Sequence, residues 1–298
     1  MTIKRFVDAH IHLWKLDLLR YPWLSPPFSD SGPNGSVEPI ATDYLPSDYF
    51  ADAKGYNVTK TVHIDAGAHP EDAIPETRWL QGLADKGQGP SAIVGFAALN
   101  EPDVEKVLAA HVQSKNVRGI RHIINWHPDP NRTYTPRDLL LDDDFARGYA
   151  LLGKYKLSFD LQIYPNQMVD AYRLAKNHPN IPVIINHMGM PVDRDAAGVA
   201  RWKSGMELLA SLPHVSCKVS GLGFVDRNWT ADSMRGMVLE TIERFGTRRT
   251  MFASDFPTDK LFNSYSKGME AYDTITKDFG ESDRDALFAG NAERIYRI

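Results

Sequence analysis

The 298-residue chain has a single cysteine, Cys217, and no long apolar run. One cysteine excludes an internal disulfide and any metal site that needs two thiolates, and it fits a reducing compartment. No stretch approaches the ~18 consecutive apolar residues that a membrane-spanning helix needs. The first ten residues also lack the apolar core of a signal peptide. We therefore expect a cytoplasmic protein without a membrane span.

A strong excess of charge of one sign is missing as well. The formal net charge is -4, and no run of basic residues interrupts the sequence, so the composition gives no sign of a nucleic-acid partner. Several catalytic motifs are absent: a G-x-G-x-x-G after a strand, H-E-x-x-H, the G-x-S-x-G elbow and the P-loop lysine motif. Dinucleotide binding, zinc-protease chemistry and a serine-hydrolase triad therefore have no supporting motif.

Short apolar, β-branched runs recur along the chain, and most precede a helical pattern. We count eight of them: Phe6–His12, Thr59–Asp65, Ile93–Leu99, Val117–Ile123, Leu157–Ile163, Val183–His187, Val215–Val219 and Thr250–Ser254. Runs that are apolar on both faces and separated by helices indicate a parallel sheet. Eight such units predict a single α/β domain over residues 1–298, a closed (β/α)₈ TIM barrel. The alternative, a doubly wound open sheet, would have fewer strands.

The intervening segments show helical spacing of apolar residues. The predicted helices are Val104–Lys115, Asp144–Lys154, Gln167–Asn177 and Thr230–Phe245, the last with Thr230 as N-cap. Two further helices, Asp283–Ala289 and Ala292–Tyr296, are expected to close the chain over the outside of the barrel.

The connection after the first strand is unusually long. Residues 13–57 are rich in proline, serine, glycine and aromatic side chains, and a short helix is expected near Pro46. Long loops in compact domains are usually functional or disordered, and the aromatic content argues against disorder. Because barrel active sites lie at the carboxyl ends of the strands, this loop is expected to form a wall or lid of the site.

Asp8-Ala-His10-Ile-His12 is the most informative segment. Residues i and i+2 of a strand point to the same face, so His10 and His12 project together. Two adjacent imidazoles suit an apolar core poorly, whereas they suit a metal ion or a negatively charged substrate oxygen. Two structural histidines with satisfied hydrogen bonds are the alternative.

Asp255 and His187 follow the last and the sixth predicted strands. The last strand neighbours the first in a closed barrel, so Asp255 comes within reach of His10 and His12. A carboxylate there can ligate a metal or act as general base on water. The alternatives are an aspartate that caps the following turn and a histidine on an outward-facing loop.

Four further residues are candidates for substrate binding. Arg121 ends the fourth strand and suits a carboxylate, whereas its neighbour His122 must face the other way. Gln162 ends the fifth strand. Lys218 lies inside the seventh, where packing explains a lysine poorly. Trp126 follows the fourth strand, and a surface position explains it equally well.

These residues resemble the amidohydrolase superfamily, and more narrowly its lactonase branch: 2-pyrone-4,6-dicarboxylate lactonase and the fuconolactone, rhamnonolactone and galactarolactone hydrolases. The segments that carry the resemblance span the chain: Asp8–Trp14, Tyr21–Trp23, Asn186–Pro191, Cys217–Gly221, Ser254–Pro257 and Gly290–Tyr296. The resemblance implies that Asp255 is the general base. It implies that His10, His12 and His187 polarise a lactone carbonyl. Arg121 and Lys218 would hold carboxylate or hydroxyl groups.

The resemblance leaves metal dependence open. Binuclear members use a bridging lysine on strand 4 or 5 and a strand-5 histidine, where this chain has Arg121-His122 and Gln162. A binuclear centre is therefore not expected. One divalent ion such as zinc could use His10, His12 and Asp255, and the branch also includes members that work without metal.

The favoured function is hydrolysis of a small carboxylated or sugar-acid lactone. Two alternatives remain: a metal-dependent non-oxidative decarboxylase of the same superfamily, against which Gln162 argues, and an inactive barrel used for binding. The oligomeric state stays open, and a homo-oligomer is compatible with the sequence.

Overall fold

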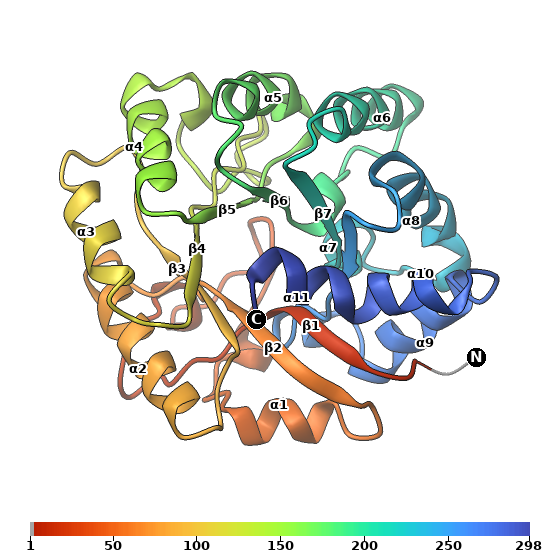
Figure 1. Cartoon of the computed structure of the whole chain (residues 1–298), viewed down its shortest axis with the longest axis horizontal. Coiled ribbons are helices and arrows are strands. Elements are labelled where there is room, and N and C mark those ends of the chain that lie inside the picture. The colour runs from red at the N-terminus through yellow and green to blue at the C-terminus, as the bar shows by residue number, and fades with distance from the viewer. Residues whose placement is uncertain (1–2) are drawn as a thin grey trace.

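The computed structural model describes residues 3–298 and is built around one sheet of eight parallel strands in sequential order (Figure 1). The strands are β1 (Phe6–Ile11), β2 (Val58–Ile64), β3 (Ala92–Phe96), β4 (Val117–Arg121), β5 (Ser158–Leu161), β6 (Val183–Ile185), β7 (Val215–Val219) and β8 (Thr250–Phe252). A parallel bridge between Ile11 and Phe256 joins the segment after β8 to β1. The predicted (β/α)₈ barrel is confirmed, and each predicted run overlaps one strand.

Helices surround the barrel (Figure 1). They are α1 (Pro46–Asp52), α2 (Ala73–Asp85), α3 (Val104–His111), α4 (Asp143–Lys154), α5 (Met168–Asn177), α6 (Ala196–Ala210), α7 (Leu222–Val225), α8 (Ala231–Phe245), α9 (Tyr265–Ile275), α10 (Glu281–Asp285) and α11 (Asn291–Tyr296). Thr230 caps α8 as predicted, because its hydroxyl accepts a hydrogen bond from the Ser233 N–H at 3.1 Å. The helix predicted to reach Lys115 is shorter, since α3 ends at His111.

The long connection after β1 is folded. Trp14 and Tyr44 exchange two backbone hydrogen bonds of 3.0 Å, which close the loop at its base. The indole of Trp14 is fully buried and donates to the Thr42 carbonyl at 2.6 Å. The short helix expected near Pro46 is α1. Aromatic residues of the connection, such as Trp14, Tyr21 and Tyr44, are buried, and this burial explains why so long a connection is ordered.

The C-terminal segment differs from the expectation. A π-helical turn, Ala286–Gly290, joins α10 to α11. Ala289, Ala292 and Tyr296 belong to the same buried cluster as the barrel residues Val7 and Val62. In Figure 1, α11 crosses the centre of the barrel. This segment therefore packs into the barrel end rather than along its outside, because Ala289, Ala292 and Tyr296 bury apolar surface against the strands there.

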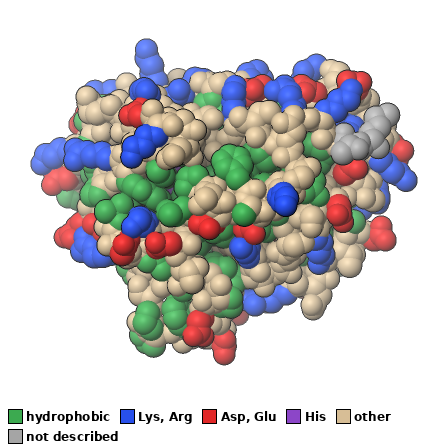
Figure 2. Space-filling model, turned by 90° about the horizontal axis from the view of Figure 1, so that it is seen from below, with side chains coloured by type: hydrophobic (Ala, Val, Ile, Leu, Met, Phe, Trp, Pro, Cys, Tyr) green, Lys and Arg blue, Asp and Glu red, His purple; other side chains and the backbone are tan. Residues whose placement is uncertain are grey.

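The surface carries mixed charges. On the face seen in Figure 2, basic and acidic side chains are interspersed around apolar areas. No helix within residues 3–298 is long and apolar enough to cross a membrane.

Candidate active site

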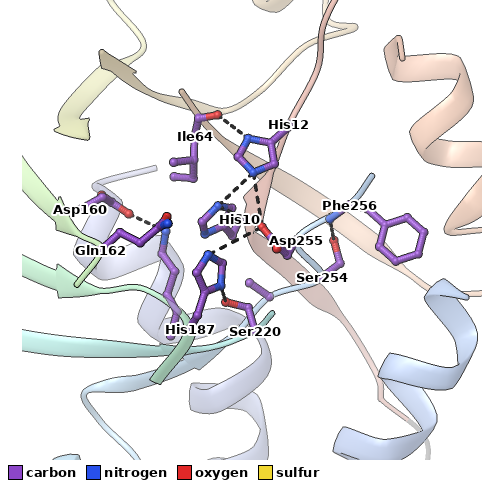
Figure 3. Close-up of polar contacts among 12 residues, drawn as sticks. His10, His12, Ile64, Asp160, Gln162, His187, Ser220, Ser254, Asp255 and Phe256 are labelled. Carbon is purple, nitrogen blue, oxygen red and sulfur yellow. Dashed lines mark hydrogen bonds and ion pairs between the residues drawn. The ribbon is translucent and has the colours of Figure 1, made fainter. Parts of the chain in front are cut away.

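The carboxyl ends of β1, β6 and β8 bring three histidines and one aspartate together (Figure 3). The Nε2 atoms of His10 and His12 lie 3.2 Å apart, on the shared face that their spacing predicts. Asp255 Oδ1 lies 3.2 Å from His10 Nε2 and 3.3 Å from His12 Nε2. His187 Nε2 is 4.0 Å from the same oxygen. The four residues singled out in the sequence thus form one buried cluster.

The barrel seam fixes Asp255 relative to the histidine pair. The Asp255 N–H donates to the His10 carbonyl at 2.9 Å, and the His12 N–H donates to the Phe256 carbonyl at 2.8 Å. Asp255 has a φ of +59°, a left-handed conformation that costs a non-glycine residue about 1 kcal/mol. The two seam hydrogen bonds offset this cost and turn the carboxylate toward the rings.

A left-handed turn presents His187. His187, Met188, Gly189 and Met190 have successive φ values of 53°, 55°, 70° and 46°. The indole of Trp202 holds this turn by donating to the Met188 carbonyl at 2.7 Å. The turn therefore brings His187 over the site directly after β6.

Hydrogen bonds on the far side of two rings orient them. His12 Nδ1 donates to the Ile64 carbonyl at 2.8 Å, which turns the Nε2 atom toward Asp255 Oδ1 at 3.3 Å. His187 Nδ1 lies 2.9 Å from the Ser220 hydroxyl. Both contacts favour rings whose Nε2 atoms face the centre of the cluster.

Burial sets the protonation of the cluster. Burial, together with the positive charge of Lys218, lowers the pKa of His10 well below its usual value. Burial also lowers the pKa of His187 to about 4. Burial opposes ionisation of Asp255, but nearby His187, His12 and Arg121 outweigh it and lower the pKa of this carboxyl. At neutral pH the cluster therefore contains the ionised Asp255 carboxylate beside the neutral imidazoles of His10 and His187.

The donor set suits a single metal ion. Donor atoms of His10, His187 and Asp255 all lie within 4.8 Å of one another. A tetrahedral zinc ion with bonds of 2.0–2.1 Å would hold its ligands about 3.3 Å apart. The contacts of 3.2 and 3.3 Å among His10, His12 and Asp255 match that spacing. The predicted set of His10, His12 and Asp255 has this spacing, whereas the donor group that lies within 4.8 Å has His187 in place of His12. Metal binding by either set stays a prediction.

A cavity of about 510 Å³ opens above the cluster. Its walls come largely from the long loop after β1 and from later strand ends. They include Trp23, Pro27, Phe28, Pro33, Asn34, Gly35, Ile123, Tyr134, Met190 and Phe224. The loop thus forms a wall of the cavity, and the space lies within the range of about 300–1,000 Å³ typical of small-molecule sites.

Arg121 and Gln162 also line this cavity. The Arg121 guanidinium donates to Gln162 Oε1 at 3.1 Å and to Asp65 Oδ2 at 3.3 Å, and it also contacts the Asp65 carbonyl. These contacts hold the cation in the wall. His122 faces away from the cavity and packs against Phe145, as the strand alternation requires.

The structure places Lys218 and Trp126 outside the cavity lining. Lys218 is fully buried, and its ammonium donates to Asp160 Oδ1 at 2.5 Å. Ser220, which contacts His187, directly follows β7. Lys218 lies two residues earlier, inside the strand, so it occupies a deeper layer of the barrel. Trp126 is half-buried, and its backbone N–H, not its indole, donates to Gln167 Oε1 at 2.9 Å.

The sequence assigns no role to Asp8, and for Tyr134, in the loop after the fourth strand, a ligand contact and a surface position fit it equally well. Asp8 precedes His10 by two residues on β1, so strand alternation alone could have placed it on the inner face. Tyr134 lines the cavity and donates to Asn34 Oδ1 of the long loop at 2.6 Å. Tyr134 lies in an irregular connection without periodicity, so no sequence pattern marks its position.

Comparison with known proteins supports one family. The amidohydrolase family model matches residues 7–298. The chain is 43% identical over 293 residues to the uncharacterized protein y4mH of Sinorhizobium fredii, covering 98% of each. It is 28% identical over 305 aligned positions to the L-fucono-1,5-lactonase of Burkholderia multivorans, covering 98% of this chain and 96% of that one.

A solved structure agrees over the whole length. An amidohydrolase from Burkholderia multivorans with bound HEPES has a TM-score of 0.81 and 27% identity, covering 98% of this chain and 99% of that one. Its zinc-bound crystal form has a TM-score of 0.80 and 25% identity, with the same coverage. On the strength of the family match over residues 7–298, this chain belongs to the amidohydrolase family.

Proposed function

We propose that the protein hydrolyses a small lactone and that sugar-acid 1,5-lactones are the first substrates to test. The observation that carries the proposal is the Asp255 carboxylate among three imidazoles, where Asp255, His12 and His187 line a small cavity. The relative named L-fucono-1,5-lactonase, aligned over 98% of this chain, gives the substrate class.

Asp255 is suited to act as the general base. Its side chain lines the cavity and its Oδ1 faces the histidines, whereas its Oδ2 is buried without a hydrogen-bond partner within residues 3–298. The carboxylate can accept a proton from water as the water oxygen attacks the lactone carbonyl carbon. When the tetrahedral intermediate collapses, the ring C–O bond breaks and Asp255 returns the proton to the departing oxygen. The product is the open hydroxy acid.

The histidines serve the electrophilic side of the reaction. His12 and His187 line the cavity and are suited to stabilise the negative charge that develops on the carbonyl oxygen, whereas His10 does not line it and contacts Asp255. A zinc ion held by His10, His12 and Asp255 would supply Lewis acidity toward that oxygen when bound. The neutral state of His10 and His187 suits ligand and hydrogen-bonding roles alike.

The cavity walls suit a polar ring. Arg121 and Gln162 place nitrogen donors beside the cluster for substrate hydroxyl or carboxylate oxygens. Trp23, Phe28 and Phe224 supply apolar faces against which the ring carbons can pack.

The test is a panel of sugar-acid lactones and pyrone dicarboxylates, assayed with and without a chelator and paired with elemental analysis. Ring opening of at least one lactone is expected, and one zinc per chain would identify the electrophile. A folded protein that opens none of them contradicts the proposal. Release of CO₂ from an aromatic or muconate-type acid, abolished by chelator, would instead favour the decarboxylase alternative.

A further inference from the structure

Asp8 is a buried carboxylate two residues before His10 on β1. The proposed hydrolysis assigns it no role. Its side chain is inaccessible to solvent. Oδ1 accepts hydrogen bonds from the Ser254 N–H at 2.9 Å and the His10 N–H at 3.4 Å. Oδ2 accepts from the hydroxyls of Tyr49 at 2.8 Å and Tyr265 at 3.3 Å. Four donors thus converge on one carboxylate.

These donors come from elements far apart in the sequence. Tyr49 belongs to α1, inside the long loop that forms the cavity wall, and Tyr265 belongs to α9. Ser254 follows β8 directly before Asp255, and its hydroxyl accepts from the Phe256 N–H at 3.1 Å (Figure 3). Asp8 therefore connects the backbone that carries His10 to the backbone that carries Asp255.

The four donors around Asp8 suit an ionised carboxylate better than a neutral amide. An ionised carboxylate only accepts hydrogen bonds, so it can satisfy all four donors, whereas an amide offers one acceptor oxygen and two donor hydrogens. Within residues 3–298 no lysine, arginine or histidine forms a salt bridge with Asp8. A buried charge held by hydrogen bonds alone is a costly means of stabilising a fold. This cost favours a role in geometry.

We propose that Asp8 is a positioning residue: through the Ser254 and His10 backbones it holds the Asp255 carboxylate against the histidine pair across the β1–β8 seam. The activity part of this inference rests on the proposed lactone hydrolysis. The geometric part does not rest on lactone hydrolysis, because it concerns only the placement of the Asp255 carboxylate and the imidazole rings.

The activity test compares Asp8→Asn with Asp52→Asn. Asp52 is a matched control on α1: it accepts from the Tyr44 hydroxyl at 2.6 Å and pairs with Lys260 at 2.9 Å, but it does not line the cavity. Loss of an outer hydrogen-bonding partner lowers activity by about 10–100-fold, so we expect that loss in kcat for D8N, with KM little changed. D52N should keep the wild-type kcat. Equal kcat in D8N and D52N, per folded molecule, would overturn the inference.

Two milder variants remain informative if D8N folds poorly. Tyr49→Phe removes the shorter hydroxyl contact of 2.8 Å and Tyr265→Phe the longer one of 3.3 Å. We expect kcat to fall in both and further in Y49F. Unchanged kcat in both variants would contradict a positioning role.

A measurement independent of any lactone separates failure of this inference from failure of the proposed function. Long-range ¹H–¹⁵N spectra of histidine-labelled protein report the ring nitrogens of His10 and His12. These signals should shift in Y49F and D8N and stay unchanged in D52N. Identical ring signals in all variants would reject the inference even if the wild type hydrolyses lactones.

Discussion

His122 and His187 show at the residue scale how burial controls imidazole charge. Burial lowers the pKa of each to about 4, although His187 faces the cavity and His122 packs outside it. An unfolded histidine titrates near pH 6.5, so between pH 6.5 and 4 only the unfolded chain binds these protons. Stability therefore rises with pH across this window and is lost on acidification.

His122→Gln tests this linkage away from the catalytic cluster. A folded pKa of about 4 means that His122 costs the folded state about 2 kcal/mol more at pH 5 than at pH 7. Glutamine does not titrate, so H122Q should lose about 2 kcal/mol less unfolding free energy than wild type over that interval. Urea unfolding at both pH values measures the difference in unfolding free energy. Other titrating groups contribute equally in the two proteins, so their effects cancel; among them is Asp8, whose raised pKa makes stability fall as pH rises. Identical pH dependence would contradict a neutral buried His122.

Sequence alternation predicted which side chains face inward but not how deep they lie. His10 and His12 share a face because strand period fixes it, and the structure brings both to the cluster. The same rule points Lys218 inward, yet depth along the barrel axis depends on strand stagger, which the sequence does not encode locally. Lys218 therefore lies a layer below the cavity, bound to Asp160.

At the element scale, Gly221 and Gly246 both have a positive φ, but only Gly221 lies against a residue of the catalytic cluster. A Cβ on Gly221, at φ +61°, would lie 2.5 Å from His187 Nδ1. A Cβ on Gly246, at φ +71°, would meet nothing within 4 Å. Gly221 therefore leaves the space that the His187 ring occupies.

Gly221→Ala should lose about 1–2 kcal/mol of unfolding free energy, because alanine is strained in the left-handed region. Gly246→Ala should lose about 1–3 kcal/mol, because its φ of 71° and ψ of 163° lie in a region that is open essentially to glycine alone. Only G221A also displaces the His187 ring, and we expect its kcat to fall by about 10–100-fold. Denaturant unfolding and lactone kinetics on the same preparations measure both effects. Equal activity in the two variants would show that His187 placement is unimportant.

Long irregular connections were the least predictable elements. The loop after β1 was recognised by its proline and aromatic content, and its closing contact between Trp14 and Tyr44 gives it a defined shape. The loop after β4 supplies Tyr134 to the cavity, although no periodicity marks it. Such side chains are placed by tertiary contacts, here the hydrogen bond from Tyr134 to Asn34, which local pattern cannot reveal.

At the scale of the whole molecule, the C-terminal helix is linked to the interior below the site. The Tyr296 hydroxyl donates to Asp160 Oδ1 at 2.8 Å, and the same oxygen accepts from Lys218 at 2.5 Å. The Lys218 ammonium also lies 5.2 Å from the centre of the Tyr296 ring. The end of the chain thus completes a buried polar group inside the barrel, which a helix on the outer surface could not do.

Tyr296→Phe removes one of these contacts and leaves Asp160 with fewer donors in a buried setting. We expect a loss of about 1–3 kcal/mol in unfolding free energy, the usual cost of an unsatisfied buried polar group. Tyr155→Phe is the control, since that hydroxyl makes a 3.4 Å contact with Glu105 nearer the surface, and it should change stability by less than about 0.5 kcal/mol. Equal stability of the two variants would contradict the interior role of Tyr296.

The most direct test of the central claim is the hydrolysis of L-fucono-1,5-lactone and related sugar-acid lactones by wild type and Asp255→Asn. Wild type is expected to open at least one lactone. In D255N kcat should fall by about 10²–10⁴-fold, the usual contribution of a general base, with the fold intact. Wild-type rates in folded D255N, or no ring opening by wild type across the panel, would contradict the claim.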